Sequence, residues 1–352
     1  MVHRAAASDS RLLVATLRGV AVLDRDRSTD GWQLTRVSLP DRHVSALLFE
    51  PSRRGVFAAT HGNGIFFSAD RGETWAAASR GLTLQNVFSL NYSVVGGALT
   101  LLAGTEPVML FSSSDYGSTW RAHDAIARMP GREKWTFPAP PHVAHLKSIA
   151  IHPAQPQLYY ACIEQGALLR TTDAGDTWHE LASYARTDDA WYRDIHKIVP
   201  AYSDPRRLLM SSGVGVYRSD DAGATWTKLT GTDFQIGYPD HLIVSPRDEE
   251  TIFVSGAATS PNIWRETKAA RAVVMRSSDG GRHWQLASNG LPQNGRAAIE
   301  AMSIEIGPHR STLFLGNTDG DIYASDDEAA SWNRIATGLA PISKAMHASN
   351  LA

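Results

Sequence analysis

The sequence lacks several features that would each point to a particular class of protein. Its 352 residues include one cysteine, Cys162, which excludes an intramolecular disulfide and is typical of a reducing compartment. No apolar run reaches the length of about 18 residues that a membrane-spanning helix needs, and the N-terminal stretch has no apolar signal core. Lys and Arg number 34 against 36 Asp and Glu, so there is no basic excess to bind nucleic acid or an anionic membrane. We therefore expect a folded cytoplasmic protein that has neither as a partner.

Common catalytic motifs are missing as well. The sequence contains no G-x-S-x-G elbow, no H-E-x-x-H helix and no G-x-x-x-x-G-K-[ST] loop. These absences argue against the usual serine hydrolases, zinc proteases and P-loop enzymes.

A short motif instead recurs along the whole chain. Its six copies are SADRGETW (68–75), SSDYGSTW (113–120), TTDAGDTW (171–178), SDDAGATW (219–226), SSDGGRHW (277–284) and SDDEAASW (325–332). A degenerate copy ends at Trp32, and the intervals from Trp32 to Trp332 average about 50 residues, the length of a four-stranded propeller blade.

Each copy lies between two short segments that we expect to be β-strands, so it should form the turn of a β-hairpin. The Asp carboxylate can accept hydrogen bonds from the N–H groups of the turn and from the Ser or Thr hydroxyl two residues earlier. The Gly supplies a positive φ, and the Trp packs between sheets. The sixth copy has Ala329 in place of Gly, which predicts a strained or differently shaped turn.

This S/T-x-D-x-G-x-T-W motif resembles the Asp box, or BNR repeat, of sialidases, sortilin-type receptors and photosystem II assembly factors. The resemblance covers nearly the whole chain and implies an all-β, seven-bladed β-propeller of four-stranded blades in one domain (1–352). We expect six full blades near 43–79, 86–124, 142–183, 193–230, 238–288 and 297–336. The closing blade would be built from both termini, 11–39 plus 344–352.

Two insertions and one register position mark the expected central pocket. The insertions, 127–141 and 258–272, would lie on the face opposite the Asp boxes. Counting back from the second strand of each blade gives one equivalent residue at the pocket mouth: His43, Asn86, His145, His196, His241 and Glu300. His61 and Glu164, at the ends of second strands, would lie either in the pocket wall or in solvated loops.

Imidazoles and a carboxylate at one register are suitable ligands for a divalent metal, and we predict that His145, His196, His241 and Glu300 bind Mn, Fe or Zn. Asp194 and Asp240 would orient two of these histidines. His43, Lys344 and Arg193 are the predicted catalytic residues, as a general base and as cations for an oxyanion. The alternative for each histidine is a purely structural hydrogen bond to a neighbouring carbonyl.

Three functions follow from this pocket. The first is a metal-dependent lyase or hydrolase, or an oxygenase, acting on a small carboxylate- or sugar-like substrate; its arrangement is similar to oligogalacturonate lyase and to carotenoid-cleaving oxygenases. The second is a non-catalytic propeller that binds a protein partner or ligand, as in the assembly factors. The third, ranked lower, is a glycoside hydrolase with Glu300 and Asp194 or Asp240 as its carboxylates. A sialidase is disfavoured because the sequence has no R-I-P motif and no arginine at the shared register.

Overall fold

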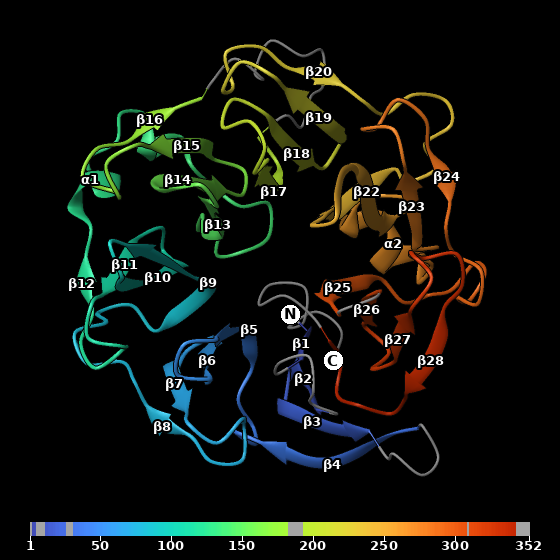
Figure 1. The fold of residues 1–352 in the computed structure, drawn as a ribbon, viewed down its shortest axis with the longest axis horizontal. Coiled ribbons are helices and arrows are strands. Elements are labelled where there is room, and N and C mark those ends of the chain that lie inside the picture. The colour runs from blue at the N-terminus through green and yellow to red at the C-terminus, as the bar shows by residue number, and fades with distance from the viewer. Residues whose placement is uncertain (1, 5–10, 26–30, 182–192, 308–309, 343–352) are drawn as a thin grey trace. The chain divides into compact units, whose positions relative to one another are not determined.

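The computed structural model describes residues 2–4, 11–25, 31–181, 193–307 and 310–342. Strands of these residues form seven four-stranded antiparallel sheets, which Figure 1 follows from β1 in blue to β28 in red. The sheets are the blades of a seven-bladed β-propeller, so the predicted all-β fold class is confirmed. No helix in this part of the chain is both long and apolar enough to cross a membrane.

The chain divides into two compact units. Unit 1 comprises Met1–His61, Phe66–Ala77 and Thr232–Ala352, and unit 2 comprises Gly62–Ile65 and Ala78–Gly231. Three sheets lie in unit 2, and four lie wholly or largely in unit 1.

The three sheets of unit 2 keep their strands in chain order, each strand pairing with the next. They are β9 (Asn86–Val95), β10 (Ala98–Glu106), β11 (Leu110–Ser113) and β12 (Arg121–Ala122); β13 (Leu146–His152), β14 (Gln155–Ile163), β15 (Ala167–Thr171) and β16 (His179–Glu180); and β17 (Ile195–Pro200), β18 (Leu208–Ser212), β19 (Gly215–Ser219) and β20 (Thr227–Lys228). Helix α1 (Asp124–Ala127) and the 3-10 turn η1 (Arg132–Lys134) follow β12.

The sheets of unit 1 have the same order. They are β1 (Val2–Arg4), β2 (Arg11–Thr16), β3 (Gly19–Arg25) and β4 (Trp32–Ser38); β5 (Val44–Glu50), β6 (Gly55–Thr60), β7 (Gly64–Ser68) and β8 (Ala76–Ala77); β21 (Tyr238–Ser245), β22 (Asp248–Ala257), β23 (Val273–Ser277) and β24 (Gln285–Leu286); and β25 (Ile299–Ile306), β26 (Ser311–Asn317), β27 (Ile322–Ser325) and β28 (Asn333–Ala336). Helix α2 (Pro261–Thr267) lies in the insertion between β22 and β23.

The first sheet corrects one part of the prediction. We expected its inner strand to come from the C-terminal segment 344–352, but β1 pairs with β2 at this place, with Val2 opposite Val14. Residues 343–352 lie outside the described part of the chain, and so does the predicted catalytic residue Lys344.

Apolar side chains pack between neighbouring sheets of each unit. In unit 2, Tyr159 and Leu169 share one cluster with Leu102 and Leu110 of the preceding sheet. The opposite face of β14 contributes Tyr160 to a second cluster with Met210. Because side chains of a strand alternate between its two faces, each middle sheet contributes to two cores.

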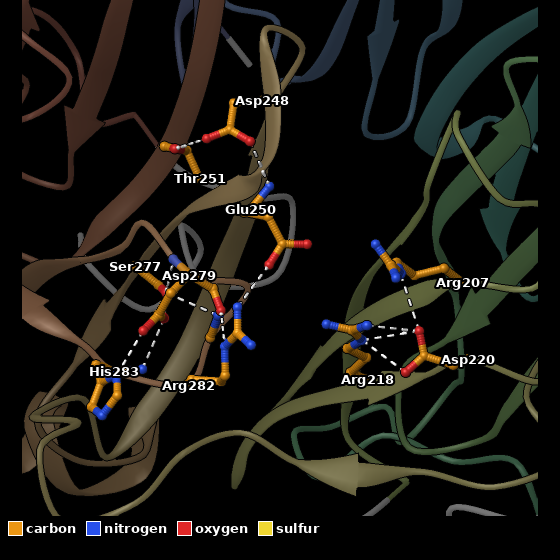
Figure 2. Close-up of polar contacts among 11 residues, drawn as sticks. Arg207, Arg218, Asp220, Asp248, Glu250, Thr251, Ser277, Asp279, Arg282 and His283 are labelled. Atoms are coloured by element: carbon orange, nitrogen blue, oxygen red, sulfur yellow. Dashed lines mark hydrogen bonds and ion pairs between the residues drawn. The ribbon is translucent and has the colours of Figure 1, made fainter.

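The repeated motif forms one hydrogen-bonded turn in all six copies. Figure 2 shows the fifth, where the Ser277 hydroxyl donates to Asp279 Oδ1 at 2.9 Å and accepts from the Gly281 N–H at 2.8 Å. The backbone N–H of His283 donates to Asp279 Oδ1 at 3.0 Å, and the imidazole Nδ1 of His283 lies 2.6 Å from Asp279 Oδ2. In the other copies a Thr or Ser hydroxyl takes the place of this imidazole.

The sixth turn keeps this pattern despite its alanine. The Ala329 N–H donates to Ser325 Oγ at 2.9 Å, as the glycines do in the other turns. Ala329 has a φ of 67°, a left-handed conformation that is unfavourable for a residue with a Cβ. The turn is therefore strained but not reshaped.

Candidate functional site

A β-bulge interrupts the first strand of six sheets near its start. At each bulge one residue has no partner on the second strand, which redirects its side chain. The bulged residues are Ser45, Phe88, Lys147, His196, Asp240 and Glu300. Four of the six are ionisable, and His196, Asp240 and Glu300 are buried. The bulges therefore place a polar side chain near the start of the first strand in five of these six sheets, with Phe88 as the exception.

The bulges also correct the register on which the sequence prediction relied. His43, Asn86 and His145 are equivalent, each lying two residues before a bulge. His196 and Glu300 are instead bulged residues, and His241 follows its bulge. The expected single position is therefore wrong for these three, because a count from the second strand ignores an unpaired residue.

The position two residues before the bulge faces the end of the second strand. Asn86 Nδ2 donates to Glu106 Oε1 at 3.3 Å, and His145 Nε2 lies 2.8 Å from Glu164 Oε2. Of the two acids, only Glu164 was a candidate for the pocket wall from the sequence. Their shared signal is a glutamate at, or just after, the last residue of a second strand.

These contacts belong to one largely buried set of ionisable side chains, which we call the unit 2 cluster. It consists of Glu106, His145, Lys147, Glu164, Asp194 and His196. Lys147 Nζ donates to Glu164 Oε1 at 2.6 Å, and its side chain is 7% exposed. His196 Nε2 lies 3.1 Å from Asp194 Oδ1 and 3.7 Å from Glu164 Oε1.

Glu164 is the centre of the cluster. Burial alone would raise the pKa of its carboxyl, but the Lys147 ammonium and the hydrogen bond from His145 hold that pKa well below its usual range. Glu164 is therefore ionised at neutral pH, although its side chain is only 3% exposed.

Aromatic rings fix the orientation of His145. The bulged Phe88 stacks on the imidazole with ring centroids 4.1 Å apart, and Phe137 contacts it at 5.0 Å. Phe137 belongs to the insertion 127–141, which therefore contacts the cluster at His145. His145 Nδ1 lies 4.0 Å from Glu106 Oε2, and both atoms are buried without a hydrogen-bond partner among the described residues.

Three side chains of the cluster are of residue types that bind metal ions, and their candidate ligand atoms converge. The candidate ligand atoms of Glu164, Asp194 and His196 all lie within 4.8 Å of one another. Two ligands bound to one cation at the usual 2.0–2.2 Å lie about 3 to 4 Å apart, as the contacts of His196 do. His145 contacts the other carboxylate oxygen of Glu164, Oε2. In metal sites, a group in this position orients the carboxylate that binds the metal.

The remaining predicted residues lie elsewhere. Arg193 immediately precedes Asp194 in the sequence, and its guanidinium donates to the Gly166 carbonyl at 3.5 Å. His43, His241 and Glu300 belong to unit 1, where His241 Nδ1 lies 3.9 Å from Asp240 Oδ2. The predicted set His145, His196, His241 and Glu300 is thus divided between the units, and as a set of four it stays a prediction.

Comparisons with known proteins show what the chain is similar to. No protein-family model matches it. A xyloglucanase from Paenibacillus sp is 24% identical over 212 residues, which are 53% of this chain and 20% of that protein. Xyloglucanase Xgh74A from Acetivibrio thermocellus is 23% identical over 297 residues, or 71% and 34%. The chain therefore spans about a fifth to a third of the curated relatives it matches.

Solved structures agree with the fold over most of their length. YCF48 bound to D1 peptide has a TM-score of 0.57 and 13% identity, with 94% of this chain and 90% of that chain covered. YCF48 from Cyanidioschyzon merolae has a TM-score of 0.53 and 15% identity, with 88% and 90% covered. The chain is a seven-bladed β-propeller whose structural neighbours include YCF48 and whose sequence relatives include xyloglucanases.

Proposed function

We propose that the chain is a metal-dependent hydrolase whose cation is bound by Glu164, Asp194 and His196. The observation that carries the proposal is the approach of these three buried donors to within 4.8 Å. The similarity to xyloglucanases favours hydrolysis over a lyase or oxygenase reaction, and it favours a sugar-like substrate.

The charge of the cluster supports a cation. Its three carboxylates, Glu106, Glu164 and Asp194, are at most 6% exposed, and one ammonium, Lys147, accompanies them. The six side chains comprise three carboxylates, one ammonium and two imidazoles, so carboxylates predominate. Buried carboxylates are stabilised when they are paired or bound to a metal, and a divalent cation suits such a carboxylate-rich set.

The other residues of the site have separate roles. His145 and Lys147 fix both oxygens of Glu164, so that this carboxylate is held in one orientation. Phe137 packs against the imidazole of His145, with ring centroids 5.0 Å apart, and shields that ring from water. A bound divalent cation would supply a Lewis acid and a more acidic water.

The test combines metal content with hydrolysis. Protein purified without a histidine tag is analysed for Mn, Fe and Zn, and is assayed on xyloglucan oligosaccharides with and without EDTA. We expect about one equivalent of metal in the wild type, and its loss together with activity in Glu164→Gln and His196→Gln. Glu180→Gln, which changes an exposed glutamate of unit 2, is the matched control. Wild-type metal content in Glu164→Gln contradicts the proposed ligand set, and activity that survives EDTA contradicts metal dependence.

A second candidate is a module that binds a protein segment. The fold covers 90% of YCF48, whose structure was solved with D1 peptide. Under this function the cluster only stabilises the sheets. Substitutions in it would then lower the melting temperature without changing metal content.

A further inference from the structure

A second pair of facing side chains lies in unit 1, at the same register as the glutamate contacts of unit 2. His43 immediately precedes β5, and His61 immediately follows β6. The His61 N–H donates to the His43 carbonyl at 2.9 Å, just beyond the paired residues Val44 and Thr60. Side chains of such neighbours project from the same face of a sheet.

The chemistry of this pair differs from that of its equivalents. In unit 2 this register joins Asn86 to Glu106 and His145 to Glu164, so that a donor faces an acid in each case. In unit 1 two imidazoles face each other with ring centroids 5.6 Å apart. His43 Nε2 is buried and has no hydrogen-bond partner among the described residues.

The protonation state of His43 leaves a lone pair available. Burial, with a smaller contribution from the neighbouring His61, lowers the pKa of His43 to about 4. The imidazole is therefore neutral at pH 7, and a neutral imidazole is a good ligand for borderline metals.

The spacing of the rings is that of two ligands on one ion. A zinc–nitrogen bond of about 2.0–2.1 Å, with the ring centroid just over 1 Å further out, puts two such centroids about 5 to 6 Å apart. We propose that His43 and His61 bind a borderline first-row metal ion such as Ni²⁺ or Zn²⁺, with water or a substrate group completing its coordination. This site lies in unit 1 and does not depend on the proposed function of the unit 2 cluster.

The test measures binding of Ni²⁺ and of Zn²⁺, separately, to untagged protein that has been stripped with EDTA. Isothermal titration calorimetry gives the stoichiometry, and long-range ¹H–¹⁵N spectra show which imidazole nitrogens shift. We expect His43→Gln and His61→Gln each to remove one equivalent of Ni²⁺ or to weaken its binding at least 100-fold. In the wild type, the ring nitrogens of both histidines should shift on metal addition.

Two further variants separate this site from other binding. His179→Gln changes an exposed histidine of β16 and should leave the titration unchanged. Glu164→Gln should leave the His43–His61 equivalent in place, so failure of the unit 2 proposal is seen separately. Wild-type Ni²⁺ and Zn²⁺ binding in both His43→Gln and His61→Gln overturns the proposal. If one of these two variants does not fold, metal binding by the other variant and the imidazole shifts of the wild type still test the proposal.

Discussion

Replacing Lys147 with methionine tests the electrostatics of the unit 2 cluster directly. Lys147 Nζ lies 2.6 Å from Glu164 Oε1, and the two side chains are 7% and 3% exposed. Methionine keeps most of the length of lysine but removes the ammonium, so that Glu164 loses its principal cation. Removing one partner of a buried ion pair costs about 3–5 kcal/mol, because the other charge stays buried.

The same substitution should make stability depend more strongly on a divalent cation. With the ammonium gone, a metal ion bound to Glu164 compensates more of the buried charge. An ion present at about 100 times its dissociation constant adds about 2.7 kcal/mol to the free energy of unfolding. We therefore expect Mn²⁺ or Zn²⁺ to restore much of the stability that Lys147→Met loses in EDTA.

Urea unfolding followed by tryptophan fluorescence measures both effects, in EDTA and with added metal. Lys134→Met, at an exposed lysine of unit 2, is the control and should change stability by less than about 0.5 kcal/mol. Wild-type stability of Lys147→Met in EDTA would refute the ion-pair reasoning. If added metal leaves the stability of Lys147→Met at its value in EDTA, the predicted cation site is refuted.

Three other predictions concern the repeated turns. Ser113→Ala leaves the buried Gly117 N–H without its acceptor and should lower the free energy of unfolding by about 1–3 kcal/mol, measured with urea. Ser118→Ala, at an exposed position of the same turn, should leave the free energy of unfolding nearly unchanged. Ala329→Gly removes the penalty of a left-handed alanine and should raise the free energy of unfolding by about 1 kcal/mol; a lower melting temperature would contradict this. Hydrogen bonds from turn hydroxyls lower the pKa of three carboxyls to about 2: Asp115, Asp173 and Asp221. Since these values lie below the unfolded value of about 3.9, their stabilisation is complete above about pH 5 and is lost as the pH falls towards 2. Fluorescence-monitored acid unfolding should show that loss, and unchanged stability from pH 5 to 2 would exclude it.

Sequence reasoning found the repeating units because their signal is local. An Asp, a Gly and a Trp at fixed spacing determine one hairpin turn, whatever the rest of the chain does. The turn around Asp279 therefore has the predicted hydrogen bonds even though His283 replaces the usual threonine.

The site was harder to predict because it depends on the register between strands. His145 and His196 were identified as candidates, and they lie in the same cluster. Their different positions relative to the bulge, the carboxylate of Glu106 and the ring of Phe137 beside His145 are set by strand pairing and loop packing. The inner strand β1 was missed for a similar reason, since three residues near the chain start carry no periodic signal.

The bulges have a consequence for how such a fold acquires new chemistry. A residue without a cross-strand partner can be exchanged without disturbing the pairs on either side, and the six bulged positions hold six different side chains, from serine to glutamate. Each of these six blades therefore offers one unpaired position at which evolution can vary charge, hydrogen bonding or metal affinity while the strand pairing that determines the fold stays the same.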